Sequence, residues 1–461
     1  MNQTDKPVLS LADCLKYADE TKELILKKNA LEEIPSLVDG FFPSNASLCM
    51  ISDEHTYEAA GMRVKKILES SGRKIIGSHV FPGEPRLHAE YEHVGFLKEW
   101  IASLPDHTNA IPVAVGAGTV NDLVKRASFE LGLPYLCVPT AASVDGFTPN
   151  GAALLMDGFK QTLPCTAPRV LAADTEVIAK APAYLASSGF GDLASKIIAG
   201  TDWIIAEKAG TVGALVAPPI DPVCWAMCQN GLFAALNASV DAVRGSAEAI
   251  GALFQALAVT GFAMQYYKDS RPVSGAEHLF SHIWEMEDLS VNGVPVTHGH
   301  KVTIGTLAAT AFTELFFSDP SGPPTTPKAY QRPTKEERKA EAVAAFKANR
   351  ACDSIVQTAL DKFMDEKTVK AINETFHDSW KEMRDRVLER LLPYGQLKDL
   401  LNKAGCPLQP EIIGISRHDA IATARKAQMM RNKYCILDLA WDMGCFENIL
   451  GIIEASDIYL R

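Results

Sequence analysis

The first half of the chain alternates short apolar runs with longer amphipathic stretches. The apolar runs predict strands at Ser47–Ile51, Lys74–Val80, Ala110–Val115 and Pro134–Val138. The stretches between them repeat apolar residues at helical spacing and predict helices at Thr56–Ser70, His88–Ser103 and Val120–Leu131. Strands that alternate with helices of this length are typical of a parallel sheet. We therefore predict an α/β domain over residues 1–215.

Beyond residue 215 the strand pattern almost disappears. Helical periodicity predicts helices at Val223–Ala238, Ser246–Tyr267, Ala276–Met286, Val302–Phe317, Lys335–Asn349, Asp353–Met364, Glu366–Leu392 and His418–Asn432. A proline-rich stretch, Ser318–Pro327, interrupts these helices and predicts an exposed insertion. Residues 216–461 should therefore form an all-helical second domain.

Composition narrows the class of protein. A chain of 461 residues is too long for one core, which agrees with two domains. Its formal net charge of -11 argues against nucleic acid as the main partner, although a local basic pocket could still hold a small anion. The N-terminus has no secretory pattern and no apolar stretch is long enough for membrane insertion. The ten scattered cysteines favour reduced thiols. We expect a cytoplasmic protein.

The first chemical motif is a glycine turn between a strand and a helix. The stretch IPVAVGAGTVNDL places Gly116 and Gly118 after an apolar strand, with a helix that opens at Thr119. Backbone N–H groups of such a turn can approach a pyrophosphate, and the helix N-terminus favours negative charge. The third glycine of the dinucleotide fingerprint is missing. A plain turn without a ligand is therefore an equally good interpretation of this stretch alone.

A second group of polar residues follows the next strand. Pro139 ends that strand, and Thr140 and Ser143 carry hydroxyls just beyond it, at the edge of an α/β sheet where ligands bind. Asp145 precedes Gly146 in the same loop. Its carboxylate could accept hydrogen bonds from substrate hydroxyls, or it could serve only an Asx-turn.

Four of the eleven histidines lie in two short stretches, SGAEHLFSH and THGHKV. His278 and His282 are four residues apart on a predicted helix, so they share one face. His298 precedes a further helix, and Asp192 follows two glycines at what we predict to be a helix start. One aspartate with two histidines is a three-ligand set, which is typical of catalytic rather than structural metal sites. Each residue alone is more often structural, and only their combination indicates a metal.

Six motifs together resemble a known family. The stretches GAGTVNDLVK, VPTAASVDGF, SGFGDLASKI, SGAEHLFSH, THGHKV and RNKYCILDLA are similar to the sn-glycerol-1-phosphate dehydrogenases. These belong to the superfamily of iron-containing alcohol dehydrogenases, glycerol dehydrogenases and dehydroquinate synthases. The resemblance implies a dehydroquinate synthase-like fold, in which residues 1–215 form a Rossmann-like dinucleotide-binding domain and residues 216–461 form a helical domain that binds metal and substrate.

The resemblance also implies roles for single residues. The metal ligands would be Asp192, His278 and His298, and the catalytic residues would be Asp145 and His282. The residues that contact the dinucleotide would be Asp53, Gly116, Gly118, Thr119, Asp122, Thr140 and Ser143. His300 departs from the family pattern, which usually has a glutamate or glutamine at this place.

The implied activity is a metal-dependent reduction of dihydroxyacetone phosphate to sn-glycerol 1-phosphate with NADH or NADPH. Zn²⁺ is the expected metal, and Fe²⁺ or Ni²⁺ suit the same mixed ligands. Cations for a triose phosphate could come from Lys160, Lys196, Arg431 or Lys433. Three alternatives stay open: a polyol or glycerol dehydrogenase, a dehydroquinate synthase-like cyclase, and a catalytically silent nucleotide-binding regulator. A homo-oligomer is compatible with each of them.

Overall fold

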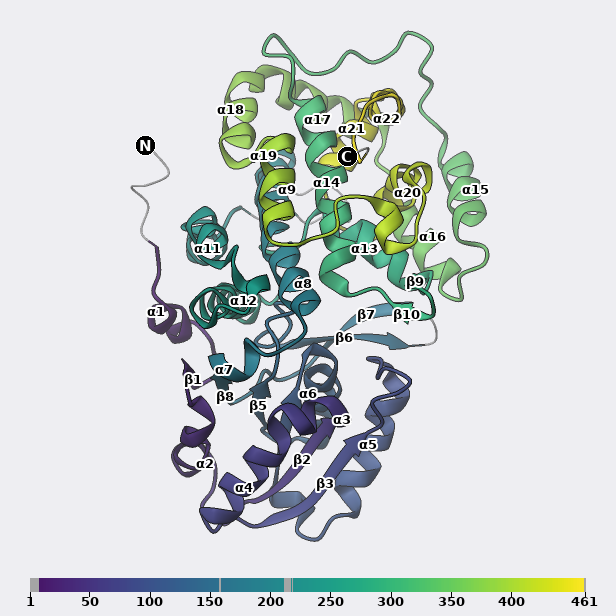
Figure 1. The fold of residues 1–461 in the computed structure, drawn as a ribbon. Coiled ribbons are helices and arrows are strands. Elements are labelled where there is room, and N and C mark those ends of the chain that lie inside the picture. The colour runs from purple at the N-terminus through teal and green to yellow at the C-terminus, as the bar shows by residue number, and fades with distance from the viewer. Residues whose placement is uncertain (1–7, 157–158, 211–216, 218, 460–461) are drawn as a thin grey trace. The chain divides into compact units, whose positions relative to one another are not determined.

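Six parallel strands organise the first part of the protein. In the computed structural model, which describes residues 8–156, 159–210, 217 and 219–459, these strands form one sheet of order β1-β8-β5-β4-β2-β3 (Figure 1). The strands are β1 (Glu23–Lys27), β2 (Ser47–Asp53), β3 (Ile75–Phe81), β4 (Ala110–Gly116), β5 (Leu136–Pro139) and β8 (Val170–Asp174). Every pair of neighbours runs parallel, which confirms the predicted sheet.

The central strands are buried on both faces, as parallel strands require. Alternate residues of β2, such as Leu48 and Met50, join a hydrophobic core with residues of two helices, α2 (Ile34–Phe41) and α4 (Met62–Ser70). The helix α6 (Gly118–Leu131) packs against β4 and β2. Because β2 and β4 are buried on both sides of the sheet, their sequences are continuous apolar runs.

The remaining elements of this part are mostly short. They are the helices α1 (Leu11–Lys16), α3 (Glu54–Thr56), α5 (Tyr91–Ser103), α7 (Thr175–Ile178), α8 (Ala183–Ala194), α11 (Leu232–Ser239) and α12 (Ala247–Tyr267), and a two-stranded sheet of β6 (Gly151–Met156) and β7 (Phe159–Pro164). A π-helical segment, Tyr57–Gly61, joins α3 to α4, so the helix predicted at Thr56–Ser70 is interrupted.

The rest of the chain is helical, as predicted. Its helices are α9 (Lys196–Ala209), α10 (Pro222–Cys228), α13 (Ala276–Met286), α14 (His298–Phe316), α15 (Lys335–Phe346), α16 (Cys352–Asp361), α17 (Glu366–Asp378), α18 (Trp380–Arg390), α19 (Tyr394–Lys403), α20 (Arg417–Met429), α21 (Ile436–Asp442) and α22 (Phe446–Ala455). Two short strands, β9 (Ser290–Val291) and β10 (Val294–Pro295), pair between α13 and α14.

The chain divides into two compact units that differ from the single boundary predicted after residue 215. The first unit holds Met1–Met156, Lys160–Leu193 and Asn230–Asp269, and the second holds Asp157–Phe159, Ala194–Gln229 and Ser270–Arg461. The helices α11 and α12 therefore return to the first unit after α9 and α10 have joined the second. A boundary drawn from the loss of strand signals could not show this return, because α11 and α12 are themselves helices.

The longest helix of the first unit, α12, is apolar along most of its length. By length and composition it is the one helix among the described residues that could cross a membrane, yet 61% of the relevant window is buried inside the protein. Polar contacts also tie it to other elements of its own unit. Gln265 donates to the Thr148 carbonyl, and Thr148 Oγ1 donates to the Ala258 carbonyl at 2.8 Å. These features are those of a core helix.

A close approach between α8 and the loop after β5 gives a stability prediction. A Cβ atom on Gly189 would lie 1.9 Å from the backbone oxygen of Ala142, which no small shift can relieve. We expect Gly189→Ala to lower the free energy of unfolding by about 1–3 kcal/mol, the usual cost of overpacking. Urea denaturation of both proteins measures this difference.

The matched control is Gly95→Ala, which changes a glycine inside α5 with nothing within 4 Å of the new Cβ. It should raise stability by about 0.5–1 kcal/mol through helix propensity alone. Equal effects of the two substitutions would contradict the close approach.

Candidate functional site

The glycine turn between β4 and α6 has the geometry of an anion cradle. Gly116 ends β4, and a Cβ on it would lie 2.5 Å from the Val120 side chain, so only glycine fits there. The helix begins at Gly118, one residue earlier than predicted, and its N-cap residue Ala117 makes no side-chain hydrogen bond to the first turn. The first-turn N–H groups, which include that of Thr119, lack intrahelical acceptors and can bind an anion.

Buried polar residues of α6 hold the loop that carries Asp145. Asn121 Nδ2 donates to the Gly146 carbonyl at 3.1 Å. Lys125 is fully buried, and its Nζ donates to the carbonyls of Gly146 at 2.7 Å and Gly151 at 3.0 Å. Sequence reasoning missed both anchors, because an asparagine and a lysine on an amphipathic helix usually indicate its exposed face.

Asp122 and Asp53 both use their carboxylates within the protein. Asp122 accepts from Lys125 Nζ at 3.3 Å and from the Ala153 N–H at 3.4 Å. Asp53 caps α3, where its Oδ1 accepts from the Thr56 N–H at 2.8 Å and the Thr56 hydroxyl accepts from the Asp53 N–H at 3.0 Å. These contacts give each residue a structural role, and their predicted contacts with a dinucleotide stay predictions.

The loop after β5 connects the sheet to Asp192. The Thr140 N–H donates to the Gly116 carbonyl at 3.1 Å, and the side chains of Thr140 and Ser143 are buried. At the far end of the loop the Asp145 N–H donates to Asp192 Oδ2 at 2.9 Å. This bond holds the carboxylate of Asp192 toward the loop.

Each of two histidines is paired with a glutamate, of which Glu277 is buried and Glu285 has a side chain that is 8% exposed. His278 Nδ1 lies 2.7 Å from Glu277 Oε1, and His298 Nδ1 lies 2.7 Å from Glu285 Oε1. Lys301 Nζ stands 3.6 Å from the same oxygen of Glu285. A carboxylate on Nδ1 selects the ring form that protonates this nitrogen, so that Nε2 can ligate a metal. Sequence reasoning did not identify the two glutamates, although Glu277 is adjacent to His278 in the motif.

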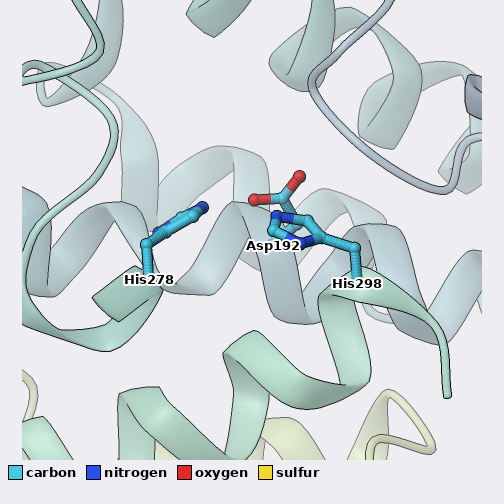
Figure 2. A group of neighbouring side chains, drawn as sticks. All are labelled: Asp192, His278 and His298. Carbon is cyan, nitrogen blue, oxygen red and sulfur yellow. The ribbon is translucent and has the colours of Figure 1, made fainter. Parts of the chain in front are cut away.

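The three predicted metal ligands lie together. One ligand atom from each of Asp192, His278 and His298 lies within 4.8 Å of the others, and Figure 2 shows the three side chains turned toward one another. They come from α8, α13 and the first residue of α14. One part of the prediction was wrong. Asp192 does not start a helix, because α8 begins at Ala183 and places Asp192 in its last turn.

His282 lies beside this group and stays neutral. Its ring centroid is 6.1 Å from that of His278 and 6.4 Å from that of His298. Burial, and next the positive charge of Arg431, hold the pKa of His282 well below its ordinary value. Burial likewise lowers the pKa of His300 to about 4. Both imidazoles are therefore uncharged at neutral pH.

Arg431 stands in an unusual backbone conformation. Its φ of 61° is in the left-handed region, which arginine rarely adopts. The segment that follows is tied down, since Lys433 Nζ donates to Ser270 Oγ at 2.6 Å and Arg271 donates to the Tyr434 carbonyl at 3.3 Å. Strained residues of this kind gather at functional sites. Of the other predicted phosphate contacts, Lys196 is fully buried and the side chain of Lys160 lies outside the described residues.

Comparison with known proteins gives a consistent picture. Residues 25–182 match the family model described as iron-containing alcohol dehydrogenase. The chain is 33% identical over 283 residues to a glycerol-1-phosphate dehydrogenase (NAD(P)+) of Bacillus velezensis. The aligned residues cover 61% of this chain and 69% of that protein. It is 30% identical to the protein of the same name from Pyrococcus horikoshii, over 62% of this chain and 77% of the relative.

Solved structures support the fold. A probable glycerol dehydrogenase from Sinorhizobium meliloti matches with a TM-score of 0.59, over 95% of this chain and 98% of that one. The two sequences are 13% identical, so this likeness concerns the fold alone.

Proposed function

The chain belongs to the glycerol-1-phosphate dehydrogenases, within the iron-containing alcohol dehydrogenases, and from this premise we propose that it reduces dihydroxyacetone phosphate to sn-glycerol 1-phosphate with NADH or NADPH and catalyses the reverse reaction. Both the names of its relatives and the chemistry of its side chains support this function. The observation that carries it is the group of Asp192, His278 and His298, whose ligand atoms lie within 4.8 Å of one another.

The donor set suits one divalent cation. Two imidazoles and one carboxylate bind Zn²⁺, Fe²⁺ or Ni²⁺, and three protein ligands leave a coordination position for substrate. The pairing of each histidine with a glutamate supports the assignment further, because an imidazole that ligates a metal usually donates its other ring N–H to a carboxylate. We propose Zn²⁺ as the resident metal.

The bound groups would supply the reactive chemistry, namely a Lewis acid for the substrate carbonyl and a hydride from the nicotinamide. The protein's own residues would position the substrate and move the proton. Neutral His282 can donate a hydrogen bond to a substrate hydroxyl. It can relay a proton to the oxygen that forms only if its other ring nitrogen takes up a proton from water in the same step. Asp145 is placed beside the ligand Asp192 by its own backbone N–H, so its carboxylate can meet substrate near the metal.

The dinucleotide would bind at the N-terminus of α6. Its pyrophosphate needs several N–H donors at close range, and the uncapped first turn after Gly116 and Gly118 offers them. Thr140 follows β5, the strand next to β4, and its N–H is held by the Gly116 carbonyl. The carboxyl ends of neighbouring strands thus carry the predicted cofactor residues Gly116, Thr140 and Ser143.

Arg431 is the cation that we propose for the substrate phosphate. Its charge acts on His282, so a guanidinium lies within electrostatic reach of the histidine that we assign to the substrate. A guanidinium binds a phosphate through paired hydrogen bonds. The support comes from this charge and not from the left-handed backbone, because Arg431 directly follows the C-cap of α20, where a left-handed residue commonly ends a helix. This contact would distinguish a triose phosphate from an uncharged polyol.

The cysteines support a reducing location. All ten are free, and nine of them are buried. Burial alone raises the pKa of Cys49 to about 12, so this thiol stays protonated and unreactive. We propose a cytoplasmic enzyme, where such thiols persist.

The metal proposal predicts different outcomes for neighbouring histidines. His278→Ala should lose the bound metal and the activity, because two ligands hold a divalent cation poorly. His282→Ala should keep the metal and lose rate, since we assign His282 to substrate. Metal analysis after loading with Zn²⁺, together with NADH oxidation, separates the two. Stoichiometric metal in His278→Ala, or equal metal loss in both variants, would refute the assignment.

The substrate proposal predicts a preference for the phosphorylated ketone. At matched ionic strength kcat/KM for dihydroxyacetone phosphate should exceed that for dihydroxyacetone by about tenfold or more, about 1.4 kcal/mol. Activity should disappear on chelation and return when Zn²⁺ is added. A preference for the uncharged ketone would favour a polyol dehydrogenase instead.

Arg431→Asn sharpens this test, since asparagine tolerates a positive φ better than most residues. Loss of one charge-assisted contact should lower kcat/KM for dihydroxyacetone phosphate by about 1.5–3 kcal/mol and leave that for dihydroxyacetone nearly unchanged. An equal loss with both ketones would show that Arg431 has no contact with phosphate.

The cofactor proposal predicts that a side chain at Gly118 obstructs the dinucleotide. Gly118→Val should raise the dinucleotide KM about tenfold or more without loss of metal. A Cβ at this position would also lie 2.9 Å from Val144 Cγ2, so the double variant Gly118→Val/Val144→Ala is the control. If the double variant regains the wild-type KM, the obstruction comes from Val144 and not from a bound pyrophosphate.

A further inference from the structure

Asp202 is a buried carboxylate that lies outside the ligand set. It belongs to α9, and its side chain is 3% exposed. Its Oδ2 accepts from the Ala276 N–H at 2.6 Å, and its Oδ1 accepts from the Ile436 N–H at 2.8 Å. Ala276 and Ile436 are the first residues of α13 and α21, where N–H groups lack intrahelical acceptors. One carboxylate therefore holds the N-termini of two helices.

The same carboxylate faces Glu277. A Cβ built on Gly275 would lie 2.5 Å from Asp202 Oδ2 and 2.8 Å from Glu277 Oε2, so the two oxygens flank one point in space. Glu277 Oε1 is occupied, because it accepts from the Gly275 N–H at 2.8 Å and pairs with His278 Nδ1. Glu277 Oε2 is buried and has no hydrogen-bond partner among the described residues.

Two carboxylates this close cannot both ionise at low cost in a buried place. Burial, and next the charge of Glu277, raise the pKa of Asp202 to about 8. Asp202 therefore links the N-termini of α13 and α21 and faces the carboxylate of Glu277, the residue that pairs with His278.

We propose that Asp202 is a positioning residue of the metal centre, which acts through Glu277 and the first turn of α13 to fix the ring of His278. Its second bond, to Ile436, anchors α21 five residues after Arg431. Asp202 thus couples the orientation of a metal ligand to the segment that we assign to the substrate phosphate. This inference rests on the proposed metal site.

The test is the Zn²⁺ affinity of the full-length, metal-free protein, measured by competition with a chromophoric chelator. Glu277→Gln should weaken Zn²⁺ binding by about 10–100-fold, as is usual for the outer partner of a ligating histidine. Asp202→Asn should weaken it by about tenfold. The double variant should lose little beyond Glu277→Gln alone, because Asp202 acts through Glu277.

The matched control is Asp221→Asn. Asp221 Oδ1 also accepts from two backbone N–H groups at a helix start, those of Val223 and Cys224, each at 2.9 Å. This variant removes a helix cap in the same unit without changing Glu277, and it should lower the melting temperature and keep the Zn²⁺ affinity. If Asp202→Asn binds Zn²⁺ as tightly as this control, or if the losses in the double variant multiply, the proposal is wrong.

A second variant covers the case in which Asp202→Asn does not fold. Gly275→Ala keeps every hydrogen-bonding group and inserts a methyl group between Asp202 and Glu277. Its φ of -114° lies outside the left-handed region, and the nearest atoms to the new methyl group are the two carboxylate oxygens, followed by Ala199 Cα at 3.2 Å. Weaker Zn²⁺ binding supports the proposal, and wild-type affinity contradicts it. Failure of the wild-type protein to bind Zn²⁺ would instead overturn the metal centre itself.

Discussion

The pairing of His278 with Glu277 and of His298 with Glu285 is the constraint on which the candidate site depends. A buried carboxylate is costly unless a positive charge or several hydrogen bonds compensate it. Glu285 has Lys301 Nζ at 3.6 Å, whereas Glu277 accepts a hydrogen bond from the Gly275 N–H at 2.8 Å. A divalent cation bound to the two histidines would lower the cost of both glutamates. The arrangement is therefore one that metal binding should stabilise.

Within the first unit, one chain of contacts joins the anion cradle to a metal ligand. The helix α6 opens with the cradle, and its next two turns carry Asn121 and Lys125, which hold the carbonyl of Gly146. The preceding residue, Asp145, donates its N–H to Asp192. A movement of α6 would therefore shift the metal ligand Asp192 through the backbone of a single short loop. Such a loop can hold the cofactor turn and the ligand in fixed register, which hydride transfer requires.

Much of the fold follows from hydrophobic pattern, and the exceptions have physical reasons. Strands β2, β3, β4 and β5 are apolar runs with helices between them, and the pattern predicted all four. It missed β1, whose ELILK stretch is flanked by charged residues, and β8, whose VLAAD stretch is rich in alanine. The helix predicted at Val223–Ala238 is broken at Gly231, whose φ of 78° is easy only for glycine.

The part of the candidate site that could be predicted is the set of metal ligands, because residue type and spacing indicate them. Histidine and aspartate are unusual in apolar stretches, so His278, His298 and Asp192 could be found from the sequence. Glu277 and Asp202 could not be assigned a role, because a carboxylate on a helix is most often exposed to solvent. Only the fold brings Asp202 to the start of α13, which lies 74 residues later in the chain.

The net charge of the sequence is also a poor guide to the ligands of the protein, because it does not show which charged residues the fold buries. The chain has 56 acidic and 45 basic residues, which gives -11, yet charge counts weigh exposed and buried residues equally. Within the described residues several cations are buried, among them Lys125, Lys196, Arg271 and Lys301. An acidic surface with cations inside repels polyanions such as nucleic acid while it still accommodates a small phosphate ester. The net charge of this protein therefore limits which macromolecules can bind to its surface. Which small ligands bind inside depends on individual buried residues.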